Sequence, residues 1–340
     1  MINGHGDDGY QYPHIRVNFS SNVYQQLDLL PLRKHLIEQM AVIQHYPEPD
    51  AYSLVELIAK QQQLATTQVA VTNGATEAIY LIAQAFANSK TSILSPVFSE
   101  YADACQIHHH TIKHFFKLDE FKGDTDLCWI CNPNNPTGEL YDKEQLIAYI
   151  KSFPSTCFVI DQSYIAFTPK ATISMAELEG LNNVILLHSL TKNYAIAGLR
   201  LGYILASSIL LKRINYFRMP WAVNSLAIIA GHYLLTHQAS LKIDLVTLLA
   251  ATHKLQRDLN SIEGIKVLPS QTHYFLAQLT NGYSALELKD YLAKTQQLLI
   301  RDASNFIGLD KSYFRVASQT TEENNLLVKT IKTGLNNGLK

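Results

Sequence analysis

Short apolar runs alternate with amphipathic stretches between residues 69 and 188, and this alternation constrains the fold more than any other feature of the sequence. Strands that are buried on both faces of a parallel sheet read as continuous apolar runs, and helices connect them. The pattern therefore predicts an α/β fold in which helices cover both faces of a mostly parallel sheet. Its expected strands are 69–72, 91–94, 126–131, 157–160 and 184–188, with helices over 75–86 and 142–151.

The 340 residues exceed one average domain, so we expect a large domain and a smaller one. After about residue 236 the rhythm changes to a long helical stretch, 239–259, which is followed by strands at 265–268, 274–277, 298–301 and 313–316 and a helix at 285–294. We predict an N-terminal arm (1–40, with a helix over 31–40) that packs with the small domain, a large cofactor-binding domain (41–235) and a small α+β domain (236–340).

Composition and charge argue against several classes of function. The net charge is -1 and no basic stripe is present, so nucleic acid is not an expected partner. The sequence has neither a long apolar run nor the apolar core of a signal peptide, so no membrane association is expected. Four cysteines are too few for a disulfide scaffold, and no cysteine pair has the context of a zinc site. We expect a cytoplasmic protein without a metal.

A lysine follows the last apolar strand, in Ser189-Leu-Thr-Lys192. An amine in such a place is a useful nucleophile when its surroundings lower its pKa, because only the neutral form attacks an aldehyde. Ser189 and Arg200 bracket the lysine with a hydroxyl and a guanidinium, which together suit a phosphate. The ordinary alternative is a set of exposed charges around a glycine turn.

A carboxylate ends another apolar strand, in Val159-Ile-Asp161-Gln-Ser-Tyr164. A buried carboxylate is costly unless it meets a cation. A protonated pyridine nitrogen supplies such a cation, and the ion pair keeps the ring electron-withdrawing. Tyr164 would then hydrogen-bond the phenolic oxygen of the same ring. Taken alone, Asp161 fits a helix cap or a turn residue equally well.

Three further segments follow predicted strands. Asn132-Pro-Asn-Asn135-Pro-Thr-Gly138 is a stiff loop that can hold Asn135 against a ligand. Asn73-Gly74-Ala75-Thr76 joins a strand to a helix, and its amides suit a phosphate. Tyr101 comes just after Ser95-Pro-Val-Phe-Ser-Glu100 and is a candidate to stack on a ring, although a lone tyrosine fits a core position as well. Because ligands bind at the carboxyl ends of strands in such sheets, the three segments point to one site.

These motifs, in this order, resemble those of the fold-type I enzymes of the class I and II aminotransferase superfamily, which use pyridoxal 5′-phosphate (PLP). The resemblance runs over nearly the whole chain. It is carried by Asn132 to Gly138, Asp161 to Tyr164, Ser189 to Lys192 and Gly198-Leu-Arg-Leu-Gly-Tyr203. It implies a large domain with a mostly parallel seven-stranded sheet covered by helices, and a smaller α+β domain.

The resemblance also implies a role for each of these residues. Lys192 would form the Schiff base with PLP, Asp161 would pair with the pyridine nitrogen, and Tyr164 and Asn135 would contact the ring oxygen. Arg315 would grip the substrate α-carboxylate. The remaining cofactor contacts would be Tyr101, which stacks on the ring, and Gly74, Ala75, Thr76, Ser189 and Arg200, which hold the phosphate. Tyr46 matches a tyrosine that reaches the phosphate from the partner subunit, which implies a homodimer.

Within the superfamily the chain is similar to two groups, the L-threonine-O-3-phosphate decarboxylases of cobalamin biosynthesis and the histidinol-phosphate aminotransferases. The first resemblance is carried by His5-Gly6, Met219-Pro-Trp-Ala-Val-Asn224 and Leu299 to Asp310. It implies that Arg301 and His5 bind the phosphate of the substrate, with Asn22 nearby. Asp7 and Asp8 depart from the pattern, because an acidic side chain that faced the site would repel a phosphate.

The expected function is decarboxylation of L-threonine O-3-phosphate to 1-amino-2-propanol phosphate. The alternative is a histidinol-phosphate-type aminotransferase that transfers an amino group to 2-oxoglutarate. PLP labilises whichever bond lies perpendicular to its ring, and the sequence does not encode that orientation. The third hypothesis is a non-catalytic regulatory or binding module with the same fold.

Overall fold

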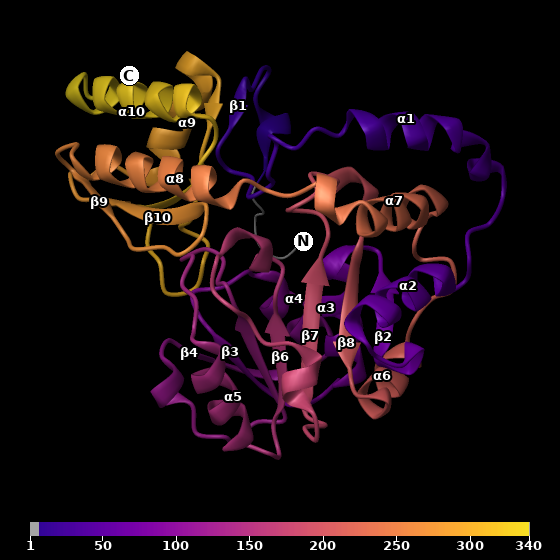
Figure 1. Cartoon of the computed structure of the whole chain (residues 1–340). Coiled ribbons are helices and arrows are strands. Elements are labelled where there is room, and N and C mark those ends of the chain that lie inside the picture. The colour runs from indigo at the N-terminus through magenta and orange to yellow at the C-terminus, as the bar shows by residue number, and fades with distance from the viewer. Residues whose placement is uncertain (1–6, 340) are drawn as a thin grey trace.

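The computed structural model describes residues 7–339, and its largest element is a seven-stranded sheet in the order β2-β8-β7-β6-β5-β3-β4 (Figure 1). Only β8 runs antiparallel to its neighbours, β2 and β7, so the prediction of a mostly parallel sheet is confirmed. The strands are β2 (Val69–Thr72), β3 (Lys90–Leu94), β4 (Thr111–Phe115), β5 (Leu127–Cys131), β6 (Cys157–Asp161), β7 (Val184–Ser189) and β8 (Gly202–Ala206).

Helices cover both faces of this sheet because alternate strand residues point to opposite sides. Cys128 and Ile130 of β5 belong to one hydrophobic core, whereas Trp129 and Cys131 belong to the other. The first core includes side chains from α2 (Tyr52–Gln62), α5 (Lys143–Lys151) and α7 (Ser225–Thr236). The second includes side chains from α3 (Gly74–Ala85), α4 (Glu100–Ile107) and α6 (Ser208–Asn215).

A smaller antiparallel sheet has the order β12-β13-β10-β9 and forms its own core with three helices. Its strands are β9 (Ile265–Val267), β10 (Tyr274–Leu279), β12 (Arg301–Asp302) and β13 (Tyr313–Ala317), and its helices are α8 (Leu245–Asn260), α9 (Ala285–Gln296) and α10 (Thr321–Asn336). The N-terminal arm joins this part, because β1 (Val17–Asn18) pairs in parallel with β11 (Leu298–Leu299). The domain boundaries at residues 40 and 235 remain predictions.

The helix expected over 31–40 is present as α1 (Leu30–Glu38), and a 3₁₀ segment, η2 (Met40–Gln44), follows it. Figure 1 shows α1 beside α7 and away from the seven-stranded sheet. Only one residue of α1, Leu32, is buried. Among residues 7–339, no helix combines the length and apolar character needed to cross a membrane.

Two elements differ from the sequence-based expectation. The helix predicted over 239–259 begins only at Leu245, because the Asp244 side chain caps it by accepting a hydrogen bond from the Thr247 amide. The strand predicted over 298–301 is divided. Leu298 and Leu299 pair with β1, whereas Arg301 pairs with Arg315 of β13.

Candidate active site

The strand ends that carry the motifs meet at one edge of the seven-stranded sheet, as parallel topology requires. β2, β5, β6 and β7 end there, and the antiparallel β8 begins there. A cavity of about 560 Å³ lies at this edge. The predicted residues that line it are Asn22, Ala75, Thr76, Tyr101, Asn135, Asp161, Tyr164, Ser189, Lys192, Arg200, Arg301 and Arg315. The structure therefore brings twelve of the predicted site residues together.

Asp161 ends β6 and is almost completely buried. One carboxylate oxygen accepts a hydrogen bond from the Tyr101 hydroxyl at 2.6 Å, and the other accepts from the Ser163 amide at 2.8 Å. Burial raises the pKa of Asp161, and the hydrogen bonds from Ser163 and Tyr101 and the charge of Lys192 counteract it. These contacts favour an ionised carboxylate that faces a cavity, where a cationic group of a ligand would complete its environment.

The ring of Tyr101 stacks on Trp129, with ring centroids 4.8 Å apart and planes inclined by 12°. Its hydroxyl is the donor to Asp161 described above, and burial raises the pKa of this phenol, so the hydroxyl stays protonated. Tyr101 also lines the cavity. The predicted stacking of Tyr101 on a cofactor ring therefore stays a prediction, whereas its contact with Asp161 is present in the structure.

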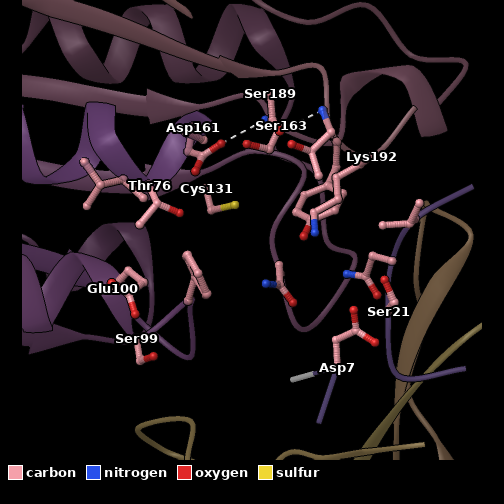
Figure 2. Close-up of a pocket in the computed structure, with 18 of the residues that line it drawn as sticks. Asp7, Ser21, Thr76, Ser99, Glu100, Cys131, Asp161, Ser163, Ser189 and Lys192 are labelled. Atoms are coloured by element: carbon pink, nitrogen blue, oxygen red, sulfur yellow. Dashed lines mark hydrogen bonds between the residues drawn. The ribbon is translucent and has the colours of Figure 1, made fainter. Parts of the chain in front are cut away.

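Lys192 follows β7 and lines the same cavity as Asp161 (Figure 2). Burial and, to a smaller extent, the nearby charges of Arg315 and Arg200 lower the pKa of its amine to about 8, although Asp7 and Asp161 oppose this shift. A lysine with such a pKa is partly neutral near physiological pH and can act as a nucleophile. The Lys192 carbonyl accepts a hydrogen bond from the Tyr24 amide at 2.9 Å.

The N-terminus of α3 and the Arg200 side chain form a cradle for an anion. Gly74 has φ +78°, and a Cβ on it would lie only 2.7 Å from Nη2 of Arg200. The N-cap residue Asn73 makes no side-chain hydrogen bond to the first turn of α3. Backbone amides, the helix dipole and a guanidinium therefore converge where only glycine leaves enough room.

Two buried arginines face each other across strands β12 and β13. Arg301 and Arg315 are directly paired in the register and are 8% and 5% exposed. Arg315 donates to the Asn135 side chain and to the Ser20 carbonyl, and Arg301 donates to Asn305 at 2.7 Å. Burial, together with the charge of Arg315, lowers the pKa of Arg301 to about 10. Like charges in this arrangement repel, so the pair favours an anionic ligand between or beside the two side chains.

Tyr164 and Asn22 lie on the same part of the cavity wall. Burial raises the pKa of Tyr164, and Arg315 and the Asn22 amide counteract this shift. The Asn22 side chain is 2% exposed, and although it lies near enough to the Tyr164 hydroxyl to lower the pKa of that phenol, neither of its polar atoms makes a well-formed hydrogen bond within the described part of the chain. Buried polar atoms of this kind are normally satisfied, so the Asn22 amide is available to a ligand.

The two acids near the N-terminus behave differently. Asp8 forms an ion pair with Lys289 of α9, and both side chains are largely buried. Asp7 lines the cavity and accepts a hydrogen bond from Asn18, and Figure 2 shows it across the opening from Asp161. Of the two departures noted in the sequence, only Asp7 therefore faces the site. His5 lies outside the described residues.

Two predicted residues do not line the cavity. Gly74 lies just behind the wall, where it makes room for Arg200. Tyr46 is 84% exposed and packs against the Trp221 ring, with centroids 5.3 Å apart. Within this single chain, Tyr46 does not reach the cavity.

Several groups that contact residues of the site were not predicted from the sequence. The Ser163 amide and the Ser20 carbonyl are backbone groups, which carry no residue-type signal. His273 lies directly before β10, where nothing in the sequence distinguishes it from an ordinary core residue. The position of Ser163 two residues after Asp161 is a recognisable signal, because an aspartate often accepts from the amide two residues on.

A model of the family "Aminotransferase class I and II" matches residues 14–331. The threonine-phosphate decarboxylase of Salmonella typhimurium is 29% identical over 338 residues, which cover 95% of this chain and 92% of that protein. The histidinol-phosphate aminotransferase of Thermoanaerobacter pseudethanolicus is 30% identical over 306 residues, which cover 84% and 83%. The crystal structure of L-threonine-O-3-phosphate decarboxylase from Porphyromonas gingivalis matches with a TM-score of 0.92 and 41% identity, over 94% of this chain and 99% of that one.

Proposed function

Since this chain belongs to the class I and II aminotransferase family, whose members depend on PLP, we propose that it is a PLP-dependent decarboxylase. Its substrate is L-threonine O-3-phosphate and its product is 1-amino-2-propanol phosphate, a reaction of cobalamin biosynthesis. Proteins named for this activity are among its relatives in sequence and in solved structure.

The observation that best supports this choice of substrate is the buried pair Arg301 and Arg315. Two guanidinium groups opposite each other on adjacent strands favour a ligand with two anionic groups. L-threonine O-3-phosphate has a carboxylate and a phosphate. In this proposal Arg315 binds the α-carboxylate and Arg301 binds the phosphate, with the Asn22 amide beside them and His5 as a further phosphate contact.

The residues at the sheet edge fit PLP. The Gly74 and Arg200 cradle, with Ala75, Thr76 and Ser189 beside it, suits the cofactor phosphate. The buried Asp161 carboxylate suits a protonated pyridine nitrogen. Tyr164 and Asn135 would contact the ring oxygen, and Tyr101 would stack on the ring. When bound, PLP supplies an electron-withdrawing ring that takes up the electron pair of the bond broken at the substrate α-carbon.

The chain's own groups then perform three tasks. The Lys192 amine would be the group that holds the cofactor. Arg315 orients the carboxylate, and its own position is fixed because Asn135 and the Ser20 carbonyl accept from its two terminal nitrogens. After carbon dioxide leaves, the Lys192 ammonium is placed to return one proton to the α-carbon.

The homodimer predicted from the sequence is part of this proposal. Tyr46 is exposed, and so are Ile37, Met40 and Ile43 on the neighbouring α1 and η2. Exposed apolar side chains that gather on adjacent elements are typical of a subunit interface. In a dimer, Tyr46 would reach the cofactor phosphate of the partner subunit. A cytoplasmic location stays a prediction.

The test is to incubate the PLP-loaded protein with L-threonine O-3-phosphate and to measure carbon dioxide release without any 2-oxo acid. The proposal expects stoichiometric carbon dioxide and 1-amino-2-propanol phosphate, and no turnover by Lys192→Ala. Amino transfer from histidinol phosphate to 2-oxoglutarate, without carbon dioxide release from threonine phosphate, would instead establish the aminotransferase alternative.

A further inference from the structure

His273 is a buried residue for which the proposed reaction has no use. It lies directly before β10 and is 1% exposed. Its ring packs on Phe167, with centroids 3.9 Å apart. Its Nε2 is 3.2 Å from the backbone carbonyl oxygen of Asn22. His273 therefore connects the smaller sheet with the segment after β6 and with the N-terminal arm.

The arm segment that His273 contacts, residues 19–24, is here called the strap. It runs from the smaller sheet to the Lys192 loop. The Phe19 carbonyl accepts from the Ala317 amide at 2.9 Å, and the Ser20 carbonyl accepts from Arg315. At its other end the Tyr24 amide donates to the Lys192 carbonyl. Between these two ends, the backbone carbonyl oxygen of Asn22 accepts a hydrogen bond from His273.

The protonation state of His273 fits a donor role. Burial lowers its pKa to about 3; the charges of Arg315 and Lys192 contribute to this shift, and the bond to Asn22 opposes it. The ring is therefore neutral and carries one proton. Because Nε2 faces a carbonyl oxygen, that proton belongs on Nε2. Nδ1 has no hydrogen-bond partner among the residues that the structure describes, so the imidazole makes a single polar contact, to Asn22.

We propose that His273 is a positioning residue that fixes the strap at Asn22 and thereby holds the Asn22 amide in the cavity for the substrate. The Asn22 side chain lines the cavity beside the Tyr164 hydroxyl, but this contact falls short of a well-formed hydrogen bond. Its position depends on its backbone, which His273 holds. This inference rests on the proposed function only for the identity of the substrate.

The test compares two variants of His273 in the PLP-loaded full chain. His273→Phe keeps a ring against Phe167 but removes the donor, and His273→Gln keeps an N–H donor of similar reach. Hydrogen–deuterium exchange is followed on peptides that cover the strap, and KM and kcat are measured with L-threonine O-3-phosphate. His273→Leu serves the same purpose if the phenylalanine variant does not fold.

Loss of one neutral hydrogen bond should speed exchange in the strap about fivefold and raise KM about fivefold in His273→Phe. Its kcat and PLP affinity should stay within about twofold of the wild type. His273→Gln should restore both the exchange and KM.

The inference is overturned if the phenylalanine variant matches the wild type in exchange and KM, or if the glutamine variant is impaired as much as the phenylalanine variant. Exchange does not require turnover. A protein that fails to decarboxylate the substrate but shows the predicted exchange pattern would therefore refute the proposed function and leave the role of His273 intact.

Discussion

At the scale of single residues, the lowered pKa of Lys192 predicts how the rate of PLP uptake depends on pH. Burial and the charges of Arg315 and Arg200 lower this pKa to about 8, and only the neutral amine reacts with an aldehyde. The neutral fraction falls about tenfold per pH unit below the pKa. The rate of PLP uptake by the apo protein should therefore rise with pH to about 8 and then level off. Stopped-flow absorbance measures this rate.

Arg315→Gln is the control for this pH profile. Because the Arg315 charge lowers the pKa of Lys192, its removal should move the midpoint of PLP uptake to higher pH. A wild-type midpoint near the ordinary lysine value of about 10.4 would show that the cavity does not shift this amine.

The second prediction at this scale concerns the substitution of Arg301. Arg301→Gln should raise KM for L-threonine O-3-phosphate by roughly 10- to 100-fold, the value of a hydrogen bond between charged groups. The rate with unphosphorylated threonine should not change, because that substrate has no phosphate to bind. Arg257→Gln, on the exposed face of α8, is the matched control. Equal losses with both substrates would argue against a phosphate contact.

Residue type and position in the sequence were enough to find the groups that follow strands, such as Asp161 and Lys192. They were not enough for groups whose role depends on distant backbone. The Ser20 carbonyl reaches Arg315, and His273 reaches the Asn22 carbonyl, across 295 and 251 positions of the chain. Such contacts exist only once the two parts of the protein are packed together.

At the scale of elements, Gly74 at the junction of β2 and α3 can be compared with Gly180, which lies between η6 (Met175–Leu178) and β7. Gly74 and Gly180 have φ +78° and +82°, so alanine at either position strains the backbone by roughly 1 kcal/mol. Only at Gly74 would the new Cβ meet a neighbour, Nη2 of Arg200, because nothing lies within 4 Å at Gly180. Gly74→Ala should therefore weaken PLP binding at least about tenfold, whereas Gly180→Ala should leave it unchanged. Fluorescence titration with PLP measures both.

A similar loss of PLP affinity in the two variants would mean that backbone strain alone explains the effect and that the cradle has no special role.

Elements with a strong pattern were predicted closely, and elements that depend on their neighbours were not. Val69–Thr72 reads as a buried strand and is β2. The edge strand β4 alternates exposed and half-buried side chains over its first four residues, so it lacks the continuous apolar signal. Ile300 separates β11 from β12 because two different partners, β1 and β13, pair with the residues on either side of it. That division is decided by tertiary pairing.

At the scale of the whole molecule, the proposed site needs two chains. In solution the protein should have about twice the mass of the 38.2 kDa chain. Tyr46→Phe should weaken PLP binding about fivefold or more, since the proposed dimer places this hydroxyl at the cofactor phosphate. Tyr10 is almost equally exposed, at 82%, and Tyr10→Phe should have no effect. Light scattering gives the mass, and PLP titration gives the affinity.

A fully PLP-loaded monomer, or equal effects of the two tyrosine substitutions, would contradict the dimeric site.

The general architecture followed from the alternation of apolar runs and helices, but the arrangement of the two parts did not. Parallel pairing of Val17 with Leu298 joins the arm to β11, next to the smaller sheet in the chain, and nothing local in either segment specifies it. The cavity depends on this packing, because Asn22 and Arg315 reach it from the arm and from the smaller sheet.

The most direct measurement of the central claim identifies the lysine that binds PLP. The protein is loaded with PLP, reduced with borohydride to fix the cofactor to its amine, digested and analysed by mass spectrometry. One phosphopyridoxyl group should be found per chain, on Lys192, and none should be found on the Lys192→Ala variant. Modification of another lysine to the same extent, or no modification at all, would contradict the account.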